Sequence, residues 1–367
     1  MAPVPRLSVI IPLYNVERYV SRLLNTLIRE SHAEFEVVIV DDASTDGSVS
    51  VVQSLIGADP RFRLITNPVN SGVSVARNHG LAMATGDYVW FVDADDDIEP
   101  GSLQKIQETL GAALEHDALT VIGERFKSTK DGLVRTGEMS TFCAEDGCRS
   151  GREMLRLLIR QNRNLQGNPW LLVVRREFLH QSGIRQAEGL SMGEDILWSM
   201  QVLLRSRKVL ATSLRPYRYI VRPQSASTSL SGRTLLAIYR FVRETYLLVE
   251  KLDSWKDADI RRYFSSLAID SLFWWNFHPD YQEGQAKGIR WGACGDFVGV
   301  EANRKMVRHL SEGISPPKRL GVWLILTASR LGTWRICDLY FRAFFRLNYR
   351  LARVKSMLSG SRRLRSS

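Results

Sequence analysis

Five carboxylates lie within seven residues of the chain, at Asp93, Asp95, Asp96, Asp97 and Glu99. They follow directly on the apolar run from Tyr88 to Val92, which is typical of a strand buried on both faces. A solvated surface turn would tolerate such a cluster, but carboxylates at the end of a buried strand repel one another in a ligand crevice. Because oxygen ligands suit Mg²⁺ or Mn²⁺, we expect Asp93 and Asp95 to face a metal ion that also binds phosphate oxygens.

Phosphate-binding glycine motifs do not occur in the sequence. The first predicted strand-to-helix junction reads Ile11-Pro12-Leu13-Tyr14-Asn15, without the glycine-rich turn of a dinucleotide-binding fold or a P-loop. A dehydrogenase or a P-loop enzyme is therefore disfavoured. A nucleotide diphosphate without these cradles needs a metal ion to offset its charge, which the carboxylate cluster could hold.

Strands and helices alternate through the first hundred residues. Short apolar runs predict the strands, and apolar residues at helical spacing predict the helices between them. This order is typical of an α/β fold with a mostly parallel, Rossmann-like sheet and helices on both faces, whose ligands bind beyond the carboxyl ends of the strands. The expected strands are 7–13, 36–40, 62–66 and 88–92, and the expected helices are 16–29, 48–56 and 74–84.

The pattern becomes mixed after Gly101 and helical after about residue 230. A polar, turn-rich stretch runs to Gly151, and a Gly-Glu-Asp turn at residues 193–195 precedes an apolar helix at 196–204. The segments 235–252 and 259–277 are helical and aromatic. We expect an α/β domain over residues 1–230, a helical extension over 231–315 and a basic amphipathic tail over 316–367.

The tail carries the whole net charge of +11, since residues 316–367 contain 12 basic residues and the single acid Asp338. On a helix, five of its arginines fall on one side and an apolar set on the other, which predicts a helix lying on an anionic membrane surface. The alternative is that the apolar side packs on the helices around Phe273 to Phe277. The five arginines are 335, 342, 346, 350 and 353, and the apolar set is Trp334, Phe341, Phe344, Phe345 and Leu351.

Cysteine usage and apolar segment lengths suggest a compartment. The four cysteines have no paired spacing, so neither a disulfide scaffold nor a thiolate zinc site is indicated. The apolar stretch 7–13 is too short for a signal peptide, and the uncharged stretch 320–329 is about half the length of a spanning helix. We expect a cytoplasmic protein held peripherally on the inner face of the cytoplasmic membrane.

Four sequence runs resemble, in order, the signatures of family 2 glycosyltransferases with a GT-A fold. They are SVIIPLYN (8–15), VDDASTDGS (40–48), NSGVSVARNHG (70–80) and GDYVWFVDADD (86–96). The resemblance is strong over roughly residues 6–100. It is looser up to about residue 230, where GEDILW (193–198) and PYRYIVRPQSAS (216–227) also resemble the family.

The resemblance implies an inverting, metal-dependent transfer of sugar from a nucleotide diphosphate donor to a saccharide or lipid-linked saccharide, as in bacterial cell-surface polysaccharide synthesis. Asp93 would lie by the ribose and Asp95 would ligate the metal, with Asp195 as general base and Glu194 beside it. An Asp42 contact to the base N–H would favour uridine. The residues bordering the nucleotide would be Pro12, Tyr14, Glu17, Asp42 and Arg77.

Several of these roles have a plain structural alternative. Asp42 could form a turn, Arg77 could make a surface ion pair, and one acid of the 194–195 pair is explained by the helix dipole alone. The family's Trp followed two residues later by Lys is also broken, because Leu172 follows Trp170. The arginines that could take the place of that lysine are Arg175, Arg176, Arg218 and Arg222.

Two other functions compete with glycosyl transfer. A nucleotidyltransferase would share the sheet and acidic metal site, but would usually carry a glycine-rich basic loop near its N-terminus. A nucleic-acid-binding protein could use the arginine-rich tail, but five acids at the ligand edge would repel a polyanion. We therefore expect no nucleic-acid partner.

Overall fold

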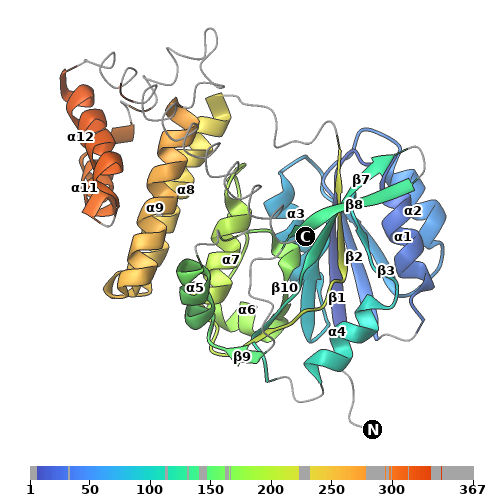
Figure 1. Ribbon diagram of the computed structural model, residues 1–367. Helices are drawn as coiled ribbons and strands as arrows, with labels where there is room; N and C mark the ends of the chain where they lie inside the picture. The colour runs from blue at the N-terminus through green and yellow to red at the C-terminus, as the bar shows by residue number, and fades with distance from the viewer. Residues whose placement is uncertain are drawn as a thin grey trace, which may run out of the picture. The chain divides into compact units, whose positions relative to one another are not determined.

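The computed structural model divides the chain into two compact units, Met1–Thr228 and Ser229–Ser367 (Figure 1). The structure describes residues 6–31, 34–111, 115–129, 132–139, 147–161, 165, 167–222, 232–277, 294, 297–298, 300–312, 314–331 and 340.

An eight-stranded sheet forms the centre of the first unit, in the order β3-β2-β1-β4-β10-β6-β11-β9. The half built from β1 (Leu7–Leu13), β2 (Phe35–Asp41), β3 (Phe62–Thr66) and β4 (Tyr88–Phe91) is parallel throughout. In the other half, β10 runs antiparallel to both of its neighbours. The α/β fold predicted from the sequence is confirmed. The strands of this second half are β6 (Ala118–Thr120), β9 (Gly147–Arg149), β10 (Leu172–Arg175) and β11 (Val209–Ala211).

Seven α-helices belong to the described part of this unit. Helix α1 begins four residues later than predicted, since the Val16 N–H donates to Ser48 Oγ (2.8 Å) and residues 17–19 form a turn. Helix α7, in contrast, begins earlier than predicted, directly at Glu194. The helices are α1 (Val20–Arg29), α2 (Ser48–Ile56), α3 (Val73–Met83), α4 (Ser102–Leu110), α5 (Gly151–Arg160), α6 (Arg176–Ser182) and α7 (Glu194–Arg205).

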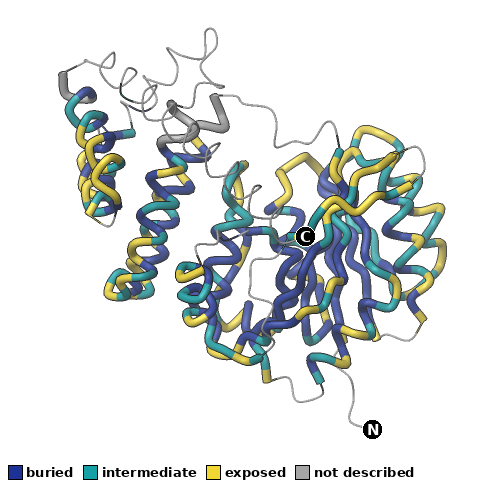
Figure 2. Tube along the Cα trace, viewed as in Figure 1, coloured by how far each residue is buried: buried dark blue, intermediate teal, exposed yellow. Residues whose placement is uncertain are grey.

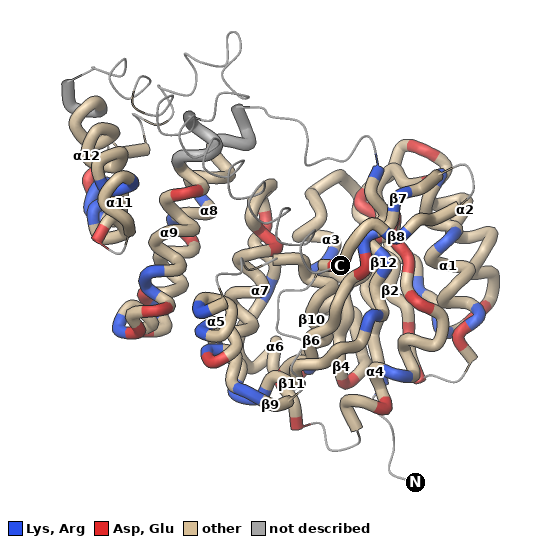
Figure 3. Tube along the Cα trace, viewed as in Figure 1, with Lys and Arg blue, Asp and Glu red and all other residues tan. Residues whose placement is uncertain are grey.

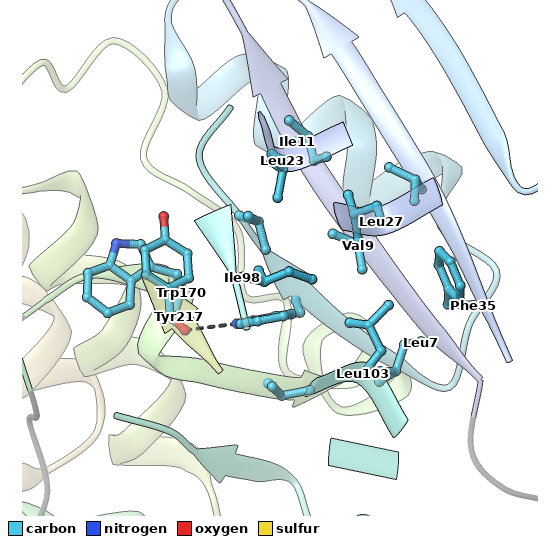
Figure 4. Close-up of a cluster of buried hydrophobic side chains, with 14 of the residues drawn as sticks. Leu7, Val9, Ile11, Leu23, Leu27, Phe35, Ile98, Leu103, Trp170 and Tyr217 are labelled. Atoms are coloured by element: carbon cyan, nitrogen blue, oxygen red, sulfur yellow. Dashed lines mark hydrogen bonds between the residues drawn. The ribbon is translucent and has the colours of Figure 1, made fainter. Parts of the chain in front are cut away.

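The two faces of β1 pack against different helices. Alternate residues point to opposite faces of a strand, so Val9 and Ile11 lie in one core with Leu23 and Leu27 of α1 (Figure 4). On the other face α3 lies very close to the sheet, because a Cβ at Gly80 would come within 2.3 Å of Ile10 Cγ2. The strands of the central sheet are accordingly the most buried layer, and exposed positions concentrate on the helices and loops around them (Figure 2).

A second sheet has four strands, two of which lie where the sequence predicted a polar, turn-rich stretch. Its order is β5-β12-β7-β8, and β7 and β8 make an antiparallel hairpin. Sequence periodicity missed β8 because most of its residues are exposed and it has no continuous apolar run. Several positions of β7 and β8 are charged (Figure 3), and Arg135 of β8 pairs with Glu124 of β7 (2.7 Å). The strands are β5 (Asp97–Ile98), β7 (Gly123–Thr129), β8 (Gly132–Met139) and β12 (Tyr217–Val221).

The second unit is helical. Helix α9 packs against α8 and α11, and α11 packs against α12. Helix α12 is tied to α9 by the Lys318–Asp270 ion pair (2.6 Å). Apart from residue 340, the predicted interfacial helix beyond Leu331 lies outside the described residues. The helices are α8 (Gly232–Lys251), α9 (Ala258–Phe277), α11 (Glu301–Glu312) and α12 (Pro316–Leu331), with a 3-10 turn at Ser254–Lys256.

Within the described part of the chain, no helix combines the length and the apolar character needed to span a membrane.

Glu36 is a buried carboxylate that joins three strands and a turn at the end of the sheet away from the acidic cluster. It accepts hydrogen bonds from Ser8 Oγ (2.7 Å), Thr85 N (2.6 Å) and Gly86 N (3.2 Å), and Arg63 pairs with its other oxygen (2.6 Å). Burial raises the pKa of Glu36, but the hydrogen bonds from Ser8 and Thr85 and the Arg63 charge outweigh it and leave the pKa below its usual value.

Replacing Glu36 by Gln should lower the free energy of unfolding at pH 7 by about 2 kcal/mol, because an amide accepts these hydrogen bonds less strongly than a carboxylate. Since the folded-state pKa is lowered, this stabilisation is present above pH 4.5, the group's ordinary pKa, and is lost as the pH falls through the lowered pKa. Urea unfolding at pH 7 and at pH 3 measures both effects. Glu34→Gln on the exposed neighbour is the control, and an equal loss in both variants would contradict this account.

Candidate functional site

The Arg77 guanidinium joins two of the predicted site carboxylates. Its NH2 lies 2.8 Å from Asp93 Oδ1, and its NH1 lies 2.7 Å from Asp195 Oδ1. Arg77 comes from α3, Asp93 follows β4 and Asp195 lies in the first turn of α7. These three elements therefore converge on one side chain, which we call the Arg77 bridge. The alternative of a surface ion pair is wrong, because the Arg77 side chain is only 4% exposed.

The charges around the Arg77 bridge shift one another's titration. Burial lowers the pKa of Arg77, but the negative charges of Asp195 and Asp93 raise it by a larger amount. The net pKa is above the usual value, so the guanidinium stays charged. Burial raises the pKa of Asp195 and Arg77 opposes this, with a net pKa above the usual value. Burial and the adjacent Asp195 raise the pKa of Glu194 to about 7. The Asp195 side chain keeps 35% of its exposure, so it remains open to a reacting group.

Asp95 lies in the loop of residues 93–97 that follows β4, which we call the acid loop. Its carboxylate forms an ion pair with Arg222, directly after β12, and both side chains are mostly buried. The Arg222 guanidinium also lies over the Tyr19 ring, 4.7 Å from its centroid. The guanidinium of Arg222 thus pairs with the carboxylate that the sequence predicted to bind a metal ion.

Of the four arginines considered for the missing lysine, Arg222 contacts a predicted site residue. Arg175 pairs with Asp117 (2.9 Å), Arg176 donates to the Gly86 carbonyl (2.7 Å), and Arg218 pairs with Glu99.

The acidic residues could supply only one or two protein ligands to a metal ion, which is how Mg²⁺ and Mn²⁺ are often bound together with nucleotides. Among the described residues, no group of three or more His, Cys, Asp or Glu side chains is arranged to hold an ion. Asp93 and Asp95 instead each bind a guanidinium. One or two carboxylates completed by substrate phosphates are enough for Mg²⁺, so the donor set fits such an ion.

Asp42 organises the loop that leads into α3. Its carboxylate accepts hydrogen bonds from Asn67 Nδ2 (2.9 Å), Ser71 N (3.1 Å) and Gly72 N (2.7 Å). These bonds use most of the hydrogen-bond acceptor sites of the two carboxylate oxygens. In the structure, the contacts of the Asp42 side chain therefore serve to form the loop. The contact to a nucleotide base stays a prediction.

The remaining predicted nucleotide contacts lie at or beyond the end of β1. Pro12 is half-buried within β1, opposite Val40 of β2, and Tyr14 is 47% exposed. The Glu17 carboxylate accepts from the Gly47 N–H (3.1 Å), which joins the loops after β1 and β2. These residues share the strand-end edge of the sheet with Asp42.

Tyr217 is a site residue that the sequence did not single out. Its hydroxyl donates to Asp96 Oδ2 (2.6 Å) and accepts from the Asp93 N–H (3.3 Å). Burial and the nearby Asp93 raise the pKa of Asp96 to about 8. The available signal was the segment PYRYIV, which resembles the family without indicating what its tyrosine contacts.

Relatives of the chain are glycosyltransferases. The model of "Glycosyl transferase family 2" matches residues 8–169. The uncharacterized glycosyltransferase YibD of Escherichia coli K12 is 32% identical over 255 residues, which cover 68% of this chain and 71% of YibD. The putative teichuronic acid biosynthesis glycosyltransferase TuaG of Bacillus subtilis is 40% identical over 101 residues, 28% of this chain and 40% of TuaG.

The fold is also that of a solved structure. S. aureus TarS 1–349 in complex with UDP-GlcNAc superposes with a TM-score of 0.69 at 21% identity, over 92% of each chain. The GT-A fold that the sequence predicted is thereby confirmed. With the family match, the similarity to YibD and the acidic strand-end site on this fold, the chain belongs to glycosyl transferase family 2.

Proposed function

We propose that this glycosyltransferase moves a sugar, with inversion, from a UDP-linked donor to a saccharide or lipid-linked saccharide in cell-surface polysaccharide synthesis. The Arg77 bridge carries the proposal, because it brings the donor-side Asp93 and the base Asp195 to one guanidinium. The UDP-GlcNAc complex of TarS supports the donor class, and the name of TuaG supports the acceptor class.

Asp195 is the proposed general base. Inversion in a single displacement needs a carboxylate that takes the proton of the attacking hydroxyl. Asp195 is exposed enough to meet an acceptor, and its bond to Arg77 (2.7 Å) fixes the orientation of its other oxygen. Its raised pKa makes it a stronger base than an ordinary aspartate. Glu194 adds negative charge beside it and is the second proposed catalytic residue.

Asp95 and Asp93 are the proposed ligands of Mg²⁺ or Mn²⁺. The ion, when bound, would offset the charge of the departing diphosphate. For Asp95 to reach a cation, its carboxylate must exchange the Arg222 guanidinium for that ion. Arg77 remains buried between its two carboxylates and keeps the crevice less negative. Tyr14, Glu17, Pro12 and Asp42 stay proposed contacts of the nucleotide.

Family membership favours glycosyl transfer over nucleotidyl transfer and over nucleic-acid binding.

The basic tail is proposed to hold the enzyme on an anionic membrane surface, on the cytoplasmic side. Within the described part of the tail, two basic residues serve the fold, since Lys318 bonds to Asp270 and Arg319 donates to the Ser311 carbonyl. The other ten basic residues of the tail lie beyond Arg319 in the sequence. Leu320 and Trp323 of α12 are 47% and 60% exposed, which adds apolar surface of the kind that enters a lipid interface.

Replacing Asp95 by Asn should reduce UDP affinity in Mn²⁺ to the level found with a chelator, because the diphosphate and the acid loop then lack a shared cation. Isothermal calorimetry measures both conditions. Glu99→Gln is the matched control, since Glu99 belongs to the same acidic cluster but pairs with Arg218. The metal assignment is wrong if wild type and Asp95→Asn bind UDP equally well in chelator and in Mn²⁺.

Replacing Asp195 by Asn should lower kcat by about 10²- to 10⁴-fold and leave UDP affinity unchanged, because an amide still accepts from Arg77 but takes no proton. Glu194→Gln should be milder. Steady-state rates of UDP release with acceptor, measured beside calorimetry, separate the two effects. Wild-type turnover in Asp195→Asn would return Asp195 to the role of a helix-terminal acid.

Changing Arg342, Arg346, Arg350 and Arg353 together to Gln should weaken binding to anionic vesicles about a hundredfold or more. Each basic residue near an anionic leaflet contributes about 1 kcal/mol. Vesicle co-sedimentation of the full chain at two salt concentrations measures the effect. The matched control changes four exposed arginines of the second unit, Arg240, Arg243, Arg261 and Arg262. Equal binding by both variants, or indifference of the wild type to anionic lipid, would remove the membrane role.

A further inference from the structure

Tyr217 is anchored by an aromatic stack beneath the acid loop. Its side chain is completely buried, and its ring stacks on Trp170 with a centroid distance of 4.0 Å and an interplanar angle of 1° (Figure 4). Trp90 meets the same ring edge-on at 6.2 Å. Trp170 in turn lies against Gly123, where a Cβ would come within 2.2 Å of the indole. This packing therefore fixes the position of the Tyr217 ring.

The hydroxyl of this fixed ring contacts the acid loop at two positions. It donates to Asp96 Oδ2 (2.6 Å) and accepts from the Asp93 N–H (3.3 Å). The other oxygen of Asp96 accepts from the Ile220 N–H (2.8 Å), three residues further along β12. Asp96 is only 2% exposed, and both of these hydrogen bonds join its carboxylate to residues of β12. The Asp96 side chain therefore anchors the acid loop to β12.

The two hydrogen bonds of the Tyr217 hydroxyl lie on either side of Asp95 in the sequence, and Asp95 is the proposed ligand of the cation. Asp95 lies between the two tethered positions, with the backbone of residue 93 held on one side and the side chain of residue 96 on the other. Its own carboxylate, unlike that of Asp96, pairs with Arg222, whose guanidinium lies over the Tyr19 ring. Rotation of the loop about either tether would carry Asp95 away from that place.

We propose that Tyr217 is a positioning residue: its hydroxyl fixes the acid loop so that Asp93 and Asp95 present their carboxylates to the cation and diphosphate of the donor. This inference rests on the proposed function. In this proposal Tyr217, at the start of β12, contributes to donor binding through the acid loop and does not itself contact the donor.

The test is Tyr217→Phe, which keeps the stacked ring and removes only the hydroxyl. UDP affinity in Mn²⁺ should fall at least about tenfold, the usual cost of losing a group that orients a metal ligand. UDP affinity in chelator should stay at the wild-type level. The matched control is Tyr219→Phe, two residues along the same strand, whose ring also stacks on Trp170 (6.3 Å). Urea unfolding of each variant checks the fold.

A second variant separates positioning from a general loss of stability. Asp96→Ala removes the Tyr217–Asp96 hydrogen bond from the other side, so the double variant with Tyr217→Phe should lose less metal-dependent UDP affinity than the sum of the two single losses. Additive losses, or wild-type behaviour of Tyr217→Phe in Mn²⁺, would overturn the inference. Metal-independent UDP binding by the wild type would instead contradict the proposed function.

Discussion

The buried Arg77 guanidinium is the interaction on which the site depends. A charge with 4% exposure is unfavourable in a protein interior unless it is paired and hydrogen-bonded. Arg77 meets this requirement with Asp93 and Asp195, and the three residues come from α3, the end of β4 and the start of α7. None of these elements can shift without leaving a buried charge short of a partner. The donor side and the proposed base are held together for the same reason that the arginine is tolerated.

Carboxylates outnumber guanidiniums in the ion pairs around this bridge. Arg77 bonds to both Asp93 and Asp195. Arg218 pairs with Asp97 and Glu99, and Arg222 pairs with Asp95. Glu194 adds a further acid whose pKa is raised to about 7. In the proposed function, a divalent cation would offset this surplus of carboxylates beside the arginines. The arginines keep the fold stable, and a cation delivered with a diphosphate would balance what they leave.

The sequence was informative where its patterns are local. Buried strands appear as continuous apolar runs, so β1 to β4 and the acids after β4 could be located from the amino-acid pattern alone. The polar β7–β8 hairpin could not, because exposed charged strands lack that pattern. Arg77 was expected near the nucleotide, but its Asp195 partner lies 118 residues away, and no periodicity connects the two. Tyr217 was missed for the same reason, since Asp96 is 121 residues distant.

The most direct test of this account is a double-mutant cycle on the Arg77 bridge, with kcat/KM for sugar transfer measured for Arg77→Met, Asp195→Asn and the double variant. If the guanidinium acts through the base that it holds, the double variant should transfer sugar no more slowly than the slower single variant. Independent, multiplicative losses would show that Arg77 and Asp195 act separately, and would contradict the central role given to the bridge.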